Sequence, residues 1–491
     1  MTGRAIAVVV GLALSVTACT SSAGEPDASV RSTEDSPGGD ASTPSGDGEG
    51  GQMRPGDLDV DEPIRPTDDI TVMGGAGGPN SADDVMLAAA VSVQEFWVRA
   101  FPDTYGTDFE EVDGGFWTYG PDTPRGSLPP CEGIQSYDDV AQNAFYCPDG
   151  DLIAWDSEVL VAPHIDEFGE FGAAIIMAHE MGHAVQARTG DFDTLPGVIA
   201  ELQADCFAGA WIADVVAGGS DDFEADIEEL DLAVAGQISI RDDPGFDPDD
   251  PAAHGSGFDR VSGLADGIFE GTDRCAGYAE EPPVVTEAAF DPEDAASGGD
   301  LSPDDLLELL LPDLEDFYTA LFASEGQEWD PVDDVIFFDP STDDVRCGSS
   351  RLTEAEAEFA IFYCGADDTV QVDGAGLVPA LQEIGDFAVG AEVARQWAFA
   401  AQARNGLTEN SRESSLNADC LTGLYAGDLF LGSDLREGGV LSLSPGDLDE
   451  AIISFLAVDG DDEQSGSAFE RSDAFRIGFL GDLAQCDALL E

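Results

Sequence analysis

The cysteine spacing in this chain occurs twice, and it restricts the fold more than any other feature. Apart from Cys19 there are eight cysteines: Cys131, Cys147, Cys206, Cys275, Cys347, Cys364, Cys420 and Cys486. In the first four, the first two cysteines are sixteen residues apart and the last two are sixty-nine apart. In the second four, the corresponding separations are seventeen and sixty-six residues. The chain therefore carries one four-cysteine frame twice.

Short matching segments surround this frame in the same order. The matched pairs are Phe145-Tyr-Cys147 with Phe362-Tyr-Cys364, Gln186-Ala-Arg188 with Gln402-Ala-Arg404, Ala204-Asp-Cys206 with Ala418-Asp-Cys420, and residues 255–260 with residues 466–471. The alternative is chance resemblance. Ordered matches predict an internal duplication, and because the period is far longer than a solenoid repeat, each copy should be a domain.

The N-terminus predicts export. Arg4 precedes an apolar stretch from Ala5 to Val16, which ends at Thr17-Ala-Cys19. This resembles a bacterial lipoprotein signal peptide covering residues 1–19, with Cys19 lipidated after cleavage; the alternative is an ordinary secretory signal. The apolar run is too short for a confident membrane span. We expect a protein at the extracellular face of the cell membrane, anchored by lipid alone.

An exported chain with an even number of cysteines favours disulfides. Four cysteines in one copy allow three pairings, and we expect Cys131 with Cys147, Cys206 with Cys275, and the corresponding pairs in the second copy. Free buried thiols are one alternative, and Cys206 as a metal ligand is another.

Composition divides the rest of the chain. Residues 20–70 are acidic and rich in Ser, Gly and Pro, which predicts a disordered tether. A second acidic stretch separates a first domain, 71–282, from a second, 301–491, with residues 283–300 as linker. With 102 acidic and 18 basic residues, the net charge is −84, so nucleic acid and anionic lipid headgroups are disfavoured as partners. The simplest interpretation of this charge is a solvated acidic surface.

Two of the chain's 4 histidines lie four residues apart in the segment Ala178-His-Glu-Met-Gly-His-Ala-Val-Gln186. Helical periodicity from Phe171 to Arg188, with Gly190 as C-terminal cap, places His179 and His183 on one helix face, where both can bind one Zn²⁺. Glu180 can then act as general base on zinc-activated water and later protonate the leaving amine. The alternative is two histidines on a helix that binds no metal.

A catalytic zinc needs a third protein ligand. The segment Glu201-Leu-Gln-Ala-Asp205 follows Pro196, a plausible helix start, and places Glu201 and Asp205 on one face. Glu201 is the candidate third ligand, and Asp205 can bind the free N–H of a ligand histidine. The alternative for Glu201 is a solvent-facing carboxylate.

These motifs resemble the glutamate-ligand zincins, such as thermolysin, and more closely the bacterial putative neutral zinc metallopeptidase family. The resemblance covers roughly residues 75–280 and rests on Ala178–Gln186, Glu201–Gly209, Gln237–Ser239 and His254-Gly255 up to Arg260. It implies zinc bound by His179, His183 and Glu201, with Glu180 catalytic. The family commonly has a second His directly after the motif, where this chain has Ala184; this should not affect zinc binding.

Two further features bear on the reaction. His254 with Arg260 is the available pair for stabilising an oxyanion, although a structural loop histidine is the alternative. Residues 152–154 are a strand candidate that could line the cleft and pair with extended substrate, or be purely structural.

The second copy lacks the metal ligands. Aligning Gln402 on Gln186 puts Arg395, Gln396 and Phe399 at the places of His179, Glu180 and His183. Ser415 aligns with Glu201, and Asp419 aligns with Asp205. We expect no zinc and no catalysis there. The second copy could pack on the first as an intramolecular pseudo-dimer, hold substrate, or serve as a spacer.

The sequence therefore predicts a mainly helical α+β protein with a zincin-like domain duplicated in tandem, the second copy degenerate. The predicted function is an exported zinc metallopeptidase that hydrolyses peptide or protein substrates. The competing class is a non-catalytic cell-surface binding or scaffold lipoprotein with a structural zinc site.

Overall fold

A computed structural model describes residues 72–73, 81–250, 252–292, 294–407, 411–432, 435–436, 439–458 and 464–490. The expected signal peptide, 1–19 with Cys19, and the expected tether, 20–70, lie outside these residues. In the described part of the chain, none of the helices has the length and apolar character needed to cross a bilayer.

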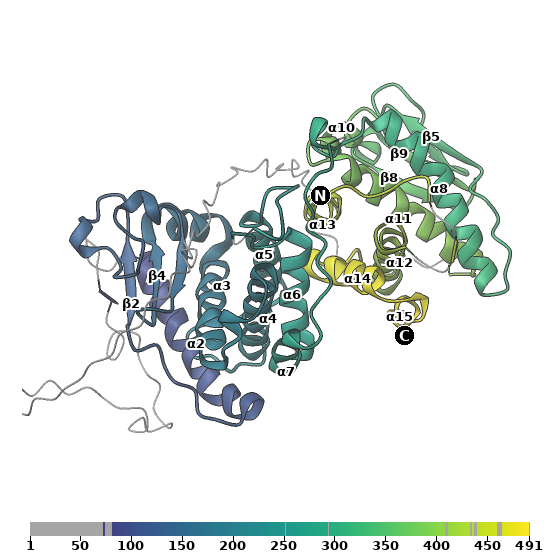
Figure 1. Ribbon diagram of the computed structural model, residues 1–491. Coiled ribbons are helices and arrows are strands. Elements are labelled where there is room, and N and C mark those ends of the chain that lie inside the picture. The colour runs from purple at the N-terminus through teal and green to yellow at the C-terminus, as the bar shows by residue number, and fades with distance from the viewer. Residues whose placement is uncertain are drawn as a thin grey trace, which may run out of the picture.

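The chain is mainly helical with small sheets, as the α+β prediction required, and forms two lobes (Figure 1). The first half contains β1 Val72–Met73, α2 Ser81–Tyr105, β2 Phe116–Tyr119, β3 Ala144–Cys147, β4 Leu152–Asp156, α3 Ala162–Thr189, α4 Gly197–Val216, α5 Ile227–Ser239, α6 Gly257–Glu270 and α7 Thr272–Ala276. The second half contains α8 Pro303–Ser324, β5 Asp334–Phe338, β6 Arg346–Cys347, β7 Ser350–Arg351, α9 Glu354–Ala357, β8 Ile361–Cys364, β9 Thr369–Asp373, α10 Leu377–Gln382, α11 Asp386–Arg404, α12 Arg412–Leu431, α13 Asp447–Ala457, α14 Ala468–Leu480 and α15 Leu483–Ala488.

The main sheets of the two halves share one pattern. In the first half the strand order is β1-β2-β4-β3, with β2 parallel and β3 antiparallel to β4. In the second half the order is β5-β9-β8, with β5 parallel and β8 antiparallel to β9. Each sheet therefore ends in an edge strand, β3 or β8, that forms a hairpin with the last strand before the long helices.

The strand candidate at residues 152–154 forms, but not where substrate could pair with it. It is part of β4, whose two edges are already hydrogen-bonded to β2 and β3. A β-strand has only two edges, so β4 cannot accept a third strand. The free edge on this side of the sheet belongs to β3.

The disulfides join the expected pairs, Cys131–Cys147, Cys206–Cys275, Cys347–Cys364 and Cys420–Cys486. The second of these ties α4 to α7, and the fourth ties α12 to α15. Because Cys206 is bonded to Cys275, it is not a thiolate metal ligand.

Glycines set the packing of the long helices in both halves. A Cβ added at Gly267 of α6 would collide with the carbonyl oxygen of Cys206 in α4. A Cβ added at Gly478 of α14 would collide in the same way with the carbonyl oxygen of Cys420 in α12. Each helix pair thus approaches to backbone contact, which only glycine permits.

The halves pack together through α5 and α6 on one side and α13 and α14 on the other (Figure 1). The apolar core of the first half continues into this contact and includes Phe455 and Phe475. Two carboxylates make reciprocal contacts across it. Asp449 accepts hydrogen bonds from the backbone N–H groups of Gly257 and Phe258, and Asp231 accepts one from Phe469 N–H.

We predict that Gly267→Ala lowers the free energy of unfolding by about 1–3 kcal/mol, because the added methyl group meets backbone that cannot rotate away. Gly277→Ala is the control, since a Cβ there would meet nothing within 4 Å. Chemical denaturation of the two variants checks this. Equal stability of both variants and the parent chain would contradict the packing argument.

Candidate metal centre

The helix that carries both motif histidines is α3. The structure extends the expected helix at its N-terminal end, to Ala162, with a break at Gly169, where φ is 77°. At the other end Gly190 adopts the left-handed conformation and its N–H bonds to the Gln186 carbonyl, as expected of a glycine cap. His179 and His183 therefore lie one turn apart on a continuous helical segment.

The third candidate ligand comes from α4. Pro196 immediately precedes this helix, as expected. Gly182 of α3 faces Ala204 of α4 so closely that a Cβ at Gly182 would lie 2.8 Å from the Ala204 Cα. This close crossing brings Glu201, one turn earlier in α4, over the two imidazoles.

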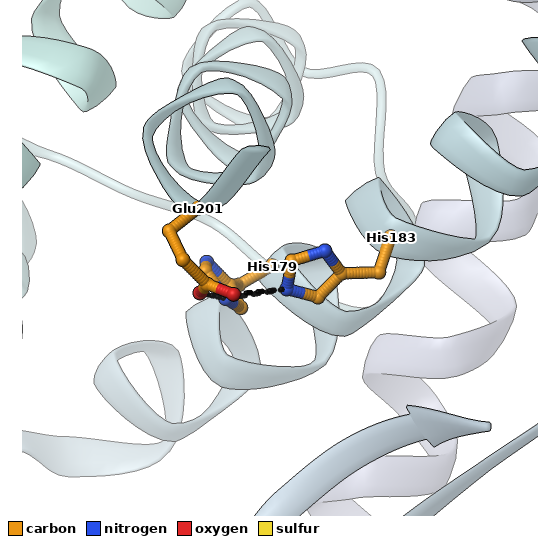
Figure 2. Close-up of side chains that lie close together, drawn as sticks. All are labelled: His179, His183 and Glu201. Carbon is orange, nitrogen blue, oxygen red and sulfur yellow. Dashed lines mark hydrogen bonds and ion pairs between the residues drawn. The ribbon is translucent and has the colours of Figure 1, made fainter. Parts of the chain in front are cut away.

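The three side chains converge on one point (Figure 2). His179 Nε2 lies 3.1 Å from His183 Nε2 and 3.2 Å from Glu201 Oε2. His183 Nε2 lies 3.5 Å from Glu201 Oε1. Each residue thus offers one ligand atom, all within 4.8 Å of one another.

Asp205 fixes the orientation of His179. Its Oδ1 accepts from His179 Nδ1 at 2.7 Å and from the Gln237 side-chain amide at 2.7 Å. Arg260 donates to both oxygens, from Nε at 2.9 Å and from an NH2 nitrogen at 3.1 Å. Asp205 is fully buried, and these donors balance its charge.

Gln186 orients the second histidine. Its Oε1 lies 2.9 Å from His183 Nδ1, and its Nε2 donates to the Ala200 carbonyl in α4 at 2.6 Å. One side chain therefore holds His183 and ties α3 to the first turn of α4. Because both Nδ1 atoms face acceptors, they carry the ring hydrogens, and both Nε2 lone pairs are left facing the shared point.

This donor set fits zinc. A cation bound at the shared point would meet both Nε2 atoms, 3.1 Å apart, and the carboxylate beside them, and two His with one Glu is a known catalytic zinc set. Electrostatics agree. Burial lowers the pKa of His179, but the charges and hydrogen bonds of Asp205 and Glu201 outweigh it and raise this pKa to about 10. Burial raises the pKa of Glu201, yet the histidines hold it well below its usual value.

Glu180 lies on the same helix, buried beside the convergent atoms. Its Oε2 accepts a hydrogen bond from the backbone N–H of Tyr146 at 2.8 Å. Tyr146 belongs to β3, whose other side pairs with β4. The free edge of β3 therefore faces Glu180, which fixes the carboxylate against the sheet.

Of the expected oxyanion pair, Arg260 is held by other partners in the structure. Arg260 is buried and gives its donors to Asp205 and to the Ile240 carbonyl, so its guanidinium does not face the convergent point. The prediction that Arg260 joins His254 in stabilising an oxyanion was therefore wrong. The Nδ1 atom of His254 lies 3.4 Å from Asp242 Oδ1. Burial lowers the pKa of His254, but the hydrogen bond to Asp242 and the charge of Glu201 raise it overall.

In the second half, a guanidinium occupies the corresponding place. Arg395 forms an ion pair with Asp419, with Nε 2.6 Å from Oδ1, and donates from an NH2 nitrogen to Ser415 Oγ at 2.6 Å. Its guanidinium carbon lies 5.1 Å from the Phe399 ring centroid. Arg471 binds the other oxygen of Asp419 at 3.1 Å, as Arg260 binds Asp205. No described His/Cys/Asp/Glu cluster of metal-binding geometry occurs at this place.

Sequence reasoning missed two residues of the first site. Gln186 served only to align the halves, although its position three residues after His183 places it on the same face of a helix. Gln237 was noted as part of a motif without a role, because nothing local shows that α5 packs against Asp205.

A comparison with protein families matches the part of the chain that contains this site. A family model described as putative neutral zinc metallopeptidase matches residues 131–278. Uncharacterized protein Rv2575 of Mycobacterium tuberculosis (strain ATCC 25618 / H37Rv) and Uncharacterized protein Mb2605 of Mycobacterium bovis are each 37% identical over 79 residues, 14% of this chain. The match spans 27% of the length of these relatives. No solved structure matches the chain.

We predict that Asp205→Asn weakens zinc binding about 10- to 100-fold, because His179 loses its orienting carboxylate. It should also cost about 3–5 kcal/mol of stability, since Arg260 is left buried without its counter-charge. Asp419→Asn is the matched control: it removes the corresponding carboxylate of the second half and should leave zinc affinity unchanged. Competition with a chromophoric chelator measures the affinity, and an equal loss in both variants would contradict the assignment.

Proposed function

We propose that this chain is a zinc-dependent peptidase whose active site lies in the first half. The observation that carries the proposal is the convergence of His179, His183 and Glu201 beside the buried carboxylate of Glu180. The family match over residues 131–278 supports the same class. Zinc, when bound, supplies a Lewis acid that polarises the scissile carbonyl and lowers the pKa of water.

Each side chain of the site has one task in this proposal. His179, His183 and Glu201 hold the metal, and Asp205 and Gln186 keep the two rings in the tautomer that presents Nε2. Glu180 takes the proton from the attacking water and passes it to the leaving amine. Its hydrogen bond from Tyr146 holds one carboxylate oxygen in place.

Substrate recognition is assigned to the edge of β3. The edge of β3 that faces Glu180 pairs with no other described strand, so we assign extended-peptide binding to this edge beyond Tyr146, whose N–H already donates to Glu180. The edge of β3 takes the role that the sequence suggested for β4, because β4 is paired on both sides. His254, held by Asp242 and close enough to Glu201 to affect its pKa, is the candidate donor to the oxyanion.

A non-catalytic lipoprotein with structural zinc is the competing function. A structural zinc usually has four protein ligands, whereas the described residues offer a three-residue set. A buried glutamate directly beside that set has no purpose in a purely structural site. Both points favour catalysis.

We further propose that residues 301–491 are a degenerate copy that packs on the first as a pseudo-dimer. The shared strand order, the shared disulfide frame and the parallel roles of Arg471 and Arg260 support the duplication. The reciprocal contacts of Asp231 and Asp449 support the two-fold packing, since an isologous interface uses the same patch from both partners. Export and lipid anchoring through Cys19 complete the proposal.

Glu180→Gln should keep one zinc per chain while hydrolysis of a broad peptide library falls about 10²- to 10⁴-fold, because the general base is lost and the ligands are not. Metal analysis and mass spectrometry of the digests check this. Stoichiometric zinc with no hydrolysis by either protein would refute the peptidase. Two zinc ions per chain would refute the metal-free second half.

His254→Ala should lower kcat about 10²-fold with zinc affinity unchanged, because a donor to the oxyanion acts on the transition state and not on the metal. Steady-state kinetics on a cleaved peptide from the library measure the effect. An unchanged kcat would make His254 a structural loop residue.

A further inference from the structure

A cluster of carboxylates lies far from the zinc ligands in sequence, where the linker meets the second half. Asp300, Asp386 and Glu450 each offer one carboxylate oxygen, all within 4.8 Å of one another. They come from three segments: the end of the linker, the first residue of α11 and the first turn of α13. Asp447 stands one turn before Glu450 in α13.

The central member of the cluster has an unsatisfied oxygen. Asp386 is 3% exposed, and its Oδ2 accepts from Leu301 N–H at 2.7 Å. Its Oδ1 has no hydrogen-bond partner among the described residues. The backbone N–H of Asp386 donates to Asp300 Oδ1, so the two carboxyl groups are held side by side. A buried carboxylate oxygen without a partner is costly and calls for a cation.

Nothing within the described chain supplies that cation. No described Arg or His forms an ion pair with Asp300, Asp386, Asp447 or Glu450, whereas Asp449, next in the chain, does pair with Arg241. Burial, together with the neighbouring carboxylates, raises the pKa of Asp386 to about 6 and the pKa values of Asp447 and Glu450 well above the usual range.

The backbone is shaped to admit the third carboxylate. A Cβ at Gly385 would collide with the carboxyl group of Glu450. When Asp231 is aligned on Asp449, Leu232 of the first half takes the position of Glu450. Gly169, which corresponds to Gly385, faces this leucine. Glu170 there corresponds to Asp386 and is exposed. The cluster is therefore specific to the second half.

We propose that Asp300, Asp386 and Glu450 bind one Ca²⁺ ion, with Asp447 beside them. All of the donors are hard carboxylate oxygens, which Ca²⁺ prefers. Ca²⁺ accepts carboxylates in a flexible coordination geometry, whereas Mg²⁺ demands a near-ideal octahedron, so three carboxylates from three separate segments suit Ca²⁺ better. The ion joins the linker to α11 and to α13, the helix that contacts the first half.

The test compares Ca²⁺ binding and thermal unfolding of the full, zinc-loaded chain with two variants. Asp386→Asn removes the central charge, and Glu450→Leu installs the residue that the first half has at this place. Both relieve repulsion among like charges, so both should fold in calcium-free buffer. Glu170→Gln is the matched control, since it removes one carboxylate from the corresponding position of the first half.

Equilibrium dialysis in about 0.15 M salt should show one saturable Ca²⁺ site in the parent chain and in Glu170→Gln, with a Kd of about 1 mM or below. Both cluster variants should lose that site and keep only the weak binding of a highly acidic surface. At saturating Ca²⁺ the parent Tm should rise by about 3–8 °C, and the cluster variants' Tm should not respond.

Identical isotherms for the parent and both cluster variants would overturn the site. Tighter binding of Mg²⁺ than of Ca²⁺ would overturn the assignment of the ion. The candidate zinc ligands are unchanged in every variant, and the readouts are Ca²⁺ binding and Tm. The test of the calcium site therefore does not depend on peptide hydrolysis.

Discussion

The buried carboxylate of Asp205 is the interaction on which the first half depends. It accepts hydrogen bonds from His179 in α3, Gln237 in α5 and Arg260 in α6, while its own helix, α4, supplies Glu201. A fully buried carboxylate is tolerated only when its charge is balanced and its oxygens are hydrogen-bonded. The packing of α3, α5 and α6 on α4 and the orientation of the His179 ring therefore depend on the same carboxylate. A change that releases Arg260 or moves α5 also moves the ring of His179.

The second half balances a buried carboxylate with guanidinium groups in place of an imidazole. Asp419 is buried between Arg395 and Arg471, and Arg395 reaches into the space that corresponds to the convergent point of the first half. A guanidinium is permanently charged, whereas an imidazole is positively charged only when it is protonated. Arg395 therefore brings a permanent positive charge to Asp419, whereas Asp205 is balanced by Arg260 and by the ring of His179.

Local sequence could predict what depends on local geometry. His179 and His183 lie one turn apart on any helix, and Asp205 lies one turn after Glu201, so the convergence of the candidate ligands and the contact of Asp205 with His179 could be expected from spacing. The cysteine frame likewise gave the disulfide pairs. The role of Arg260 could not be predicted, because it depends on how α6 crosses α4 at Gly267. The position of β4 inside the sheet, and the meeting of Asp300, Asp386 and Glu450, also depend on contacts between segments far apart in the chain.

The reciprocal contacts of Asp231 and Asp449 have a consequence for self-association. Helices α5 and α6 of the first half meet α13 and α14 of the second, so each of these surfaces is covered by the other within one chain. Because the two halves are joined by the chain, each meets the other at an effective concentration on the order of millimolar. An interface too weak to hold two separate proteins together would remain closed here, and dilution could not open it.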